Sequence, residues 1–168
     1  MTFFLSMFTP AGAEPLAVGA AAPAVAGVTD TGEKLDLGAT YSKGYTLVYF
    51  FPKADTPGCT AEGCSLRDAY QDLSDKGVTV IGVSTDDVPA QKAFRNKYHF
   101  PFTLIADKDR TIINAFGVPV REVPAFGTMA ARQSFLIDKS GKIVWRDLKA
   151  STKQQAEDVL KALKELGG

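Results

Sequence analysis

The sequence predicts an α/β fold in which helices cover both faces of one central mixed sheet. Apolar runs at 46–51, 78–84 and 102–106 alternate with segments of helical periodicity, which indicates strands connected through helices. Two further short strands and a last helix follow near the C-terminus. The 168 residues contain no repeat, linker or low-complexity block, so we expect one domain.

The first half of the chain begins with an extended lead-in at 14–26, rich in Ala, Pro and Gly. Strand-like runs at 25–28 and 33–37 flank a turn sequence and predict a hairpin. The run at 46–51 predicts a buried strand, and a helix is expected from Thr60 to Leu73, extending to about Asp75. Its apolar positions share one helical face: Leu66, Ala69, Tyr70 and Leu73.

The second half continues this alternation. After the buried strand at 78–84, Asp86 or Asp87 is expected to cap a helix over about 89–98. The remaining elements follow in order: a strand at 102–106, a short helix at 109–116, a loop at 118–131, a hairpin at 134–137 and 142–146, and a closing helix capped by Ser151 or Thr152.

Cys59 is the main candidate for chemistry because of where the predicted helix begins. Thr56 is a suitable N-cap and Pro57 suits the first helical position, so Cys59 is expected in the first turn. The free backbone N–H groups and the helix dipole there favour negative charge. A thiolate is the nucleophilic form of cysteine, so this position predicts a reactive thiol rather than an inert buried one.

The residues around Cys59 carry a family resemblance. Gly58 permits close approach to the backbone, and Pro52 stiffens the wall of the site. The pattern Pro-x-x-x-Thr-x-x-Cys resembles the peroxiredoxin signature, and Thr-Pro-Gly-Cys-Thr-x-Glu-x-Cys followed by Arg-Asp resembles the bacterioferritin comigratory protein (peroxiredoxin Q) subfamily. The resemblance implies a thioredoxin fold with an N-terminal hairpin over 16–168, leaving 1–15 as an extension or leader.

Cys64 lies five residues after Cys59. On an intact helix this separation is about 7.5 Å of rise, and the two Cα atoms would be roughly 8.6 Å apart on different faces. A disulfide needs Cα atoms about 4.4–6.8 Å apart. The pair therefore cannot form a static disulfide while the helix is folded, and a bond between the two would require the first turns to unwind.

The resemblance implies a thiol peroxidase that needs no cofactor and no metal. Cys59 would attack a hydrogen peroxide or alkyl hydroperoxide and become a sulfenic acid, with which Cys64 would condense to a disulfide. Thioredoxin or a similar dithiol protein would reduce this disulfide. Thr56, Gly58 and an arginine would position the peroxide, and the resemblance implies a monomer.

Arg132 is the expected catalytic arginine. It stands immediately before the strand-like run Gln133–Asp138, and the resembling family carries its arginine just before a strand of the form Thr-Phe-Leu-Ile-Asp. Gln133-Ser134 replace the Ser-Thr or Ala-Thr that is more usual there, which leaves the position of the arginine intact. A guanidinium is always charged and donates several N–H bonds in fixed geometry, which suits both a thiolate and a leaving oxygen. Arg67, eight residues after Cys59, is expected to be a helix-surface or ion-pair residue instead.

Composition excludes several other functions. Lys plus Arg and Asp plus Glu both number 19, and no basic stripe occurs, so a nucleic-acid partner is not expected. No segment is long and apolar enough to span a membrane. The single histidine, His99, leaves a Cys/His metal site poorly supplied and is expected in a loop.

The first 13 residues bear on the compartment. Met1–Phe8 is apolar and Ala11-Gly12-Ala13 resembles a signal-peptidase site, but no basic region precedes them. A cytoplasmic protein is therefore expected, and a periplasmic one is the alternative if residues 1–13 are the remnant of a signal peptide.

Three alternative functions remain open at this point. A dithiol oxidoreductase or redox sensor acting on protein thiols is disfavoured by the Cys-x4-Cys spacing, which differs from C-x-x-C. A non-catalytic thioredoxin-fold binding module would have an ordinary thiol at Cys59. A Cys–His acyl transferase is weaker still, because no pattern brings His99 to Cys59.

Overall fold

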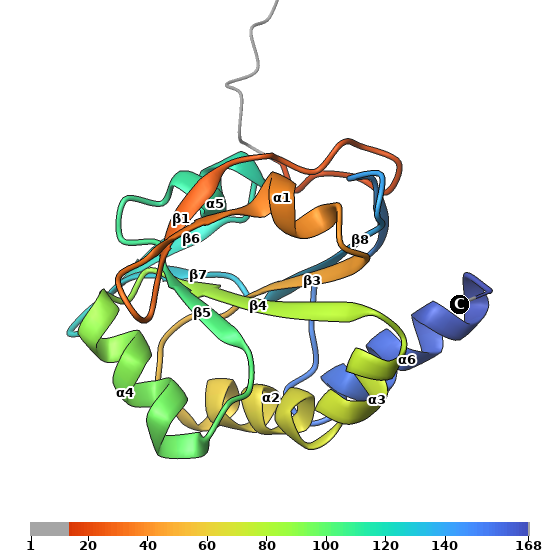
Figure 1. The fold of residues 1–168 in the computed structure, drawn as a ribbon. Coiled ribbons are helices and arrows are strands. Elements are labelled where there is room, and N and C mark those ends of the chain that lie inside the picture. The colour runs from red at the N-terminus through yellow and green to blue at the C-terminus, as the bar shows by residue number, and fades with distance from the viewer. Residues whose placement is uncertain (1–13, 168) are drawn as a thin grey trace, which may run out of the picture.

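The computed structural model describes residues 14–167, and the fold is the expected α/β arrangement (Figure 1). Gly168 and residues 1–13, including the stretch considered as a signal-peptide remnant, lie outside the described residues. None of the helices within 14–167 has the length and apolar character that crossing a membrane requires.

In the described part of the chain, seven strands form one mixed sheet in the order β2-β1-β5-β4-β3-β8-β9. The central strands β3, β4 and β5 run parallel, and the remaining pairs are antiparallel. The strands of this sheet are β1 (Ala26–Thr29), β2 (Lys34–Asp36), β3 (Tyr45–Phe50), β4 (Val78–Ser84), β5 (Thr103–Ala106), β8 (Gln133–Ile137) and β9 (Ile143–Asp147).

Helices cover both faces of the sheet, as Figure 1 shows. They are α1 (Leu37–Tyr41), α2 (Pro57–Asp68), α3 (Tyr70–Asp75), α4 (Val88–Tyr98), α5 (Thr111–Ala115) and α6 (Gln155–Glu165). One core lies under α2, α3, α4 and α6, and the other lies under α1 and α5. Because side chains alternate along a strand, Tyr49 of β3 enters the first core and Phe50 enters the second.

The structure corrects the expected elements around the hairpins. Residues 118–131 are not a loop throughout, because β6 (Val120–Val123) and β7 (Gly127–Ala130) form a separate antiparallel hairpin. Both strands are short; β6 is largely exposed and β7 buries only Ala130, so neither carries a continuous buried apolar pattern. The helix α1 was also not expected. Asp36 caps it by accepting hydrogen bonds from the N–H groups of Gly38 and Ala39.

Two helix predictions also need correction. The cysteine helix is interrupted at Ala69, whose backbone leaves helical geometry, so α2 and α3 are separate helices. The closing helix α6 starts at Gln155 rather than next to Ser151 or Thr152. The hydroxyl of Ser151 accepts a hydrogen bond from the N–H of Gln154 and contacts Asp158, so it organises the turn before the helix.

Candidate active site

The first turn of α2 positions Cys59 at the end of the parallel strand β3. Thr56 occupies the N-cap position with an extended backbone, and Pro57 is the first helical residue, as expected. The hydroxyl of Thr56 does not cap the helix, however. It donates a 2.7 Å hydrogen bond to the carbonyl of Lys53, which leaves its lone pairs free to accept. Cys59 is only 1% exposed.

The loop between β3 and α2 is tied to neighbouring elements. The N–H of Ala54 donates to the carboxylate of Asp86, which also accepts from the hydroxyl of Ser84. Asp55 has a left-handed backbone with φ of 58°. Its carboxylate accepts hydrogen bonds from Lys97 and Tyr98 on α4, and these contacts lower its pKa. The loop therefore has a defined shape before any substrate binds.

Sheet register brings Arg132 to this loop. Phe50 at the end of β3 pairs with Gln133 at the start of β8. Arg132 therefore lies beside the beginning of the segment that leads to Cys59. Its Nη2 atom donates to the Cys59 sulfur over 3.4 Å, across a separation of 73 residues.

Glu62 is the second partner of Arg132, and the sequence analysis assigned it no role. Its side chain is 0% exposed, and its Oε1 atom accepts a 2.8 Å hydrogen bond from Nη1 of Arg132. Burial raises the pKa of Glu62 to about 8, against the lowering effect of Arg132. The available signal was its position three residues after Cys59, which places both side chains on one helical face.

The electrostatics of Arg132 reflect both acidic neighbours. Burial acts to lower its pKa, but Cys59 and Glu62 outweigh burial, and the pKa of Arg132 is raised. The guanidinium therefore remains a fixed positive charge between the thiol and the carboxyl.

Gly58 is required by Arg132 rather than by its own backbone conformation. A Cβ atom at this position would lie 3.0 Å from Nη2 of Arg132 and 3.4 Å from a methyl carbon of Thr152. Glycine therefore lets the guanidinium sit over the first turn of α2, where a larger residue would make it give by a few tenths of an ångström.

Cys64 lies on the same helix as Cys59, is half-buried, and is a free thiol like Cys59. The helix between the two cysteines packs closely against Phe100, since a Cβ atom at Gly63 would lie 2.4 Å from the Phe100 ring. Cys59 and Cys64 thus lie on one continuous helix, as the predicted separation of their sulfurs requires.

A cleft of about 390 Å³ adjoins Arg132. The β6–β7 hairpin forms one wall of it, and the tip of that hairpin places Phe126 near the ammonium group of Lys53. Apolar and basic side chains line the cleft: Pro52, Pro119, Val120, Arg121, Met129, Ala130, Ala131 and Arg132. Pro52 is thus a wall residue of this cleft, and the hairpin supplies a surface that the sequence did not predict.

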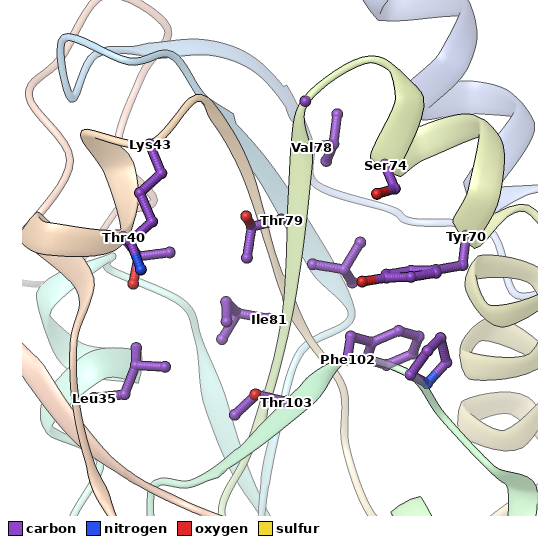
Figure 2. A pocket seen from close by; sticks show the side chains of 13 residues that line it. Leu35, Thr40, Lys43, Tyr70, Ser74, Val78, Thr79, Ile81, Phe102 and Thr103 are labelled. Atoms are coloured by element: carbon purple, nitrogen blue, oxygen red, sulfur yellow. The ribbon is translucent and has the colours of Figure 1, made fainter.

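A second cleft, of about 420 Å³, lies away from the cysteines (Figure 2). Figure 2 shows Thr79 and Ile81 of β4 between Lys43 on one side and Tyr70 on the other. This second cleft forms beside the N-terminal part of β4, which begins at Val78, before the pairing with β5 starts at Ile81. It contains no cysteine, and Lys43 is the only charged side chain among its lining residues within 14–167. The first cleft is not lined by a cysteine either, but Arg132, which contacts the Cys59 sulfur, forms part of its wall.

Two residues considered from the sequence lie outside the site. Arg67 donates to the carbonyl of Tyr98 and pairs with Asp68, as a helix-surface residue does. His99 ends α4 with a left-handed backbone and is exposed. Within residues 14–167, no group of three or more His, Cys, Asp and Glu side chains is arranged to hold a metal ion.

Comparison with known proteins gives a consistent result at the level of sequence. The model of the AhpC/TSA family matches residues 18–146. A putative peroxiredoxin bcp from Coxiella burnetii is 44% identical over 137 residues, covering 79% of this chain and 89% of that protein. The chloroplastic peroxiredoxin Q of Populus jackii is 42% identical over 97 residues, covering 58% of this chain but only 44% of that longer protein.

Solved structures agree with these relatives. Peroxidoxin BcpB from Mycobacterium tuberculosis superposes with a TM-score of 0.82 at 28% identity, covering 89% of this chain and 97% of that one. A Xanthomonas campestris bacterioferritin comigratory protein, described through its alkyl peroxide reduction activity, superposes with a TM-score of 0.79 at 27% identity. That match covers 91% of this chain and 98% of that one.

Proposed function

The chain belongs to the AhpC/TSA family of peroxiredoxins, in the bacterioferritin comigratory protein and peroxiredoxin Q subfamily, and from this premise we propose that it reduces peroxides with the thiolate of Cys59. The observation that carries the proposal is the 3.4 Å contact between Nη2 of Arg132 and the Cys59 sulfur at the first turn of α2. A helix N-terminus and a guanidinium both favour negative charge on that sulfur.

In the first step, the Cys59 sulfur attacks the terminal oxygen of the peroxide. The S–O bond forms as the O–O bond breaks, so the sulfur is oxidised to a sulfenic acid and the peroxide is reduced to an alcohol or water. Arg132 and the free N–H groups of Gly58 and Cys59 can stabilise the charge that develops on the oxygens.

Thr56 is suited to orient the peroxide. Its hydroxyl proton is committed to the carbonyl of Lys53, so its oxygen can accept a hydrogen bond from the O–H of the peroxide. The cleft beside Pro52 and Arg132 has apolar walls that can accommodate the organic part of an alkyl hydroperoxide. This geometry supports both hydrogen peroxide and alkyl hydroperoxides as substrates.

In the second step, the thiol of Cys64 attacks the Cys59 sulfenic acid, which forms a disulfide and releases water. Both residues lie on the continuous helix α2, so the first turns of α2 must unwind for the sulfurs to meet. A dithiol protein such as thioredoxin then reduces the disulfide by thiol–disulfide exchange. Nothing in this cycle requires a second copy of the chain, and we propose a monomer.

The experiment is a peroxide-consumption assay with thioredoxin, thioredoxin reductase and NADPH. We expect NADPH oxidation that depends on peroxide and on Cys59, and none in Cys59→Ser. The competing function, a dithiol oxidoreductase, is tested in parallel by disulfide transfer to a reduced substrate protein. Disulfide transfer without peroxide turnover would reject the peroxidase proposal.

A further inference from the structure

Two buried polar side chains near Cys59, Glu62 on α2 and Tyr49 on β3, are incompletely hydrogen-bonded. Glu62 is 0% exposed, and its Oε1 atom bonds to Arg132, while its Oε2 atom has no hydrogen-bond partner among the described residues. The hydroxyl of Tyr49 on β3 is likewise buried without a partner there. Native proteins rarely leave such atoms unpaired, and the exceptions call for an explanation.

A single cation, Arg132, contacts two acidic groups in this site, the carboxyl group of Glu62 and the thiol of Cys59. Arg132 reaches Glu62 with Nη1 at 2.8 Å and Cys59 with Nη2 at 3.4 Å. Keeping two anions in a closed site with a single cation is costly, because each anion loses its hydration. The site is therefore suited to one anion at a time, either the thiolate or the carboxylate.

Arg121 lines the adjoining cleft with Arg132, but among the described residues Arg132 is the only cation that acts on the pKa of Glu62 or Tyr49. Asp147 at the end of β9 raises the pKa of Glu62 further. Tyr49 stays neutral, because burial, then Glu62 and Cys59, raise its pKa well above its ordinary value. Cys64 also acts on Tyr49 in the raising direction, and Arg132 is the group that opposes all of these effects.

We propose that Glu62 is the proton-holding partner of Cys59: its carboxyl group is protonated while Cys59 is a thiolate and ionises when Cys59 becomes a sulfenic acid. The proposal rests on the peroxidase function and adds a positioning residue that acts through Arg132. Glu62 does not need to touch the substrate, because the shared guanidinium connects it to the reacting sulfur.

The proposed step balances. The thiolate, the hydroperoxide and the protonated Glu62 give a neutral sulfenic acid, an alcohol or water, and the Glu62 carboxylate. The leaving oxygen takes up one proton and Glu62 gives up one, through solvent, so the net charge of the site is unchanged. The sulfur loses two electrons to the O–O bond, and Arg132 faces one anion before and after the reaction.

Burial supports this assignment at neutral pH. It raises the pKa of Glu62 to about 8 even beside Arg132, so the carboxyl group is protonated below that pH. Above it, an ionised Glu62 would compete with the thiolate for Arg132. We therefore expect the peroxide step to slow as the pH rises through about 8.

The first test follows the carboxyl group directly by infrared difference spectroscopy. In Cys64→Ser protein, which stops at the sulfenic acid, one equivalent of peroxide should remove the band of a protonated carboxyl group. Adding Glu62→Gln should abolish this change, and adding Glu157→Gln, a change at an exposed position on α6, should leave it intact. If sulfenic acid forms and no protonated carboxyl band is lost, the proposal is wrong.

The second test is the pH profile of the peroxide step. Glu62→Gln keeps an oxygen that accepts from Arg132 but holds no titratable proton, so the alkaline decline near pH 8 should disappear. An unchanged decline in Glu62→Gln would overturn the proposal. If Glu62→Gln does not fold, the infrared measurement on Cys64→Ser decides alone. Failure of the peroxidase function itself would show as no sulfenic acid in that variant.

Discussion

Arg132 lies 3.4 Å from the Cys59 sulfur although 73 residues separate them in the chain. The contact exists because β8 pairs with β3 in the register that places Gln133 opposite Phe50. The guanidinium beside Cys59 thus belongs to the residue that precedes the strand beginning where β3 ends, and the functional consequences can be tested residue by residue.

The forked geometry of Arg132 should matter beyond its charge. Arg132→Lys retains a cation but offers one nitrogen in place of the two, held in one plane, that contact Glu62 and Cys59. We expect the peroxide step to slow tenfold or more, equivalent to at least about 1.4 kcal/mol of transition-state stabilisation. Stopped-flow peroxide kinetics measure it.

Arg67→Lys is the matched control for this change. Arg67 donates to the carbonyl of Tyr98 and does not reach the sulfur of Cys59, so its variant should react at the wild-type rate. A wild-type rate in Arg132→Lys with an impaired Arg67→Lys would transfer the role to Arg67.

The two cysteines should have unequal roles. Cys59 is at the first turn of α2 and contacts Arg132, whereas Cys64 lies further along the helix. Cys59→Ser should abolish peroxide reduction, while Cys64→Ser should complete the first step and leave a sulfenic acid that a dimedone-type reagent traps. Mass spectrometry identifies the adduct. Trapping in Cys59→Ser and none in Cys64→Ser would mean that the roles are reversed.

Disulfide formation should unfold the start of α2 and loosen α6. Residues 57–65 must leave helical geometry for the bond to form. The hydroxyl of Ser65 on α2 accepts a hydrogen bond from the N–H of Ala156 in the first turn of α6. The N-cap residue of α6, Gln154, makes no side-chain cap hydrogen bond of its own. We therefore expect faster amide exchange after peroxide treatment, both over 57–65 and at the N-terminus of α6.

The matched variant for the α6 effect is Ser65→Ala in the fully reduced protein. It removes the hydrogen bond to Ala156 without any redox change, so exchange should rise at the start of α6 and not over 57–65. Equal protection of residues 57–65 in reduced protein and in protein shown by mass to carry the Cys59–Cys64 bond would contradict the local unwinding.

Gly58→Ala should separate activity from stability. Its Cβ atom would meet Nη2 of Arg132 at 3.0 Å, so the guanidinium beside Cys59 would have to give by a few tenths of an ångström. We expect the peroxide step to slow about tenfold, since small misplacements in a site are costly. The free energy of unfolding should stay the same or rise by up to about 1 kcal/mol, because alanine favours the helix more than glycine does.

Gly63→Ala on the same helix should show the opposite pattern. Its Cβ atom would lie 2.4 Å from the buried Phe100 ring, so the free energy of unfolding should fall by about 1–3 kcal/mol. Denaturant melts and peroxide kinetics on both variants check the pair. Unimpaired kinetics in Gly58→Ala would show that Arg132 tolerates the displacement.

Local signals in the sequence determined much of the fold and the place of Cys59. The alternation of apolar runs with helical periodicity predicted all seven strands of the main sheet, and Thr56 with Pro57 predicted where α2 begins. These features depend on neighbouring residues, because helix starts and strand patterns are set by backbone propensity and by periodic burial.

Tertiary packing alone decided the rest. The β6–β7 hairpin was missed because its short strands lack a continuous buried apolar pattern. The start of α6 was misplaced, and there a distant helix takes part, since the hydroxyl of Ser65 accepts a hydrogen bond from the N–H of Ala156. Arg132 was expected only through resemblance, and sheet register is what brings it to Cys59. Sequence spacing could place Glu62 on the face of Cys59, but only the packing of α2 onto the sheet buries it and raises its pKa to about 8, since burial removes its water.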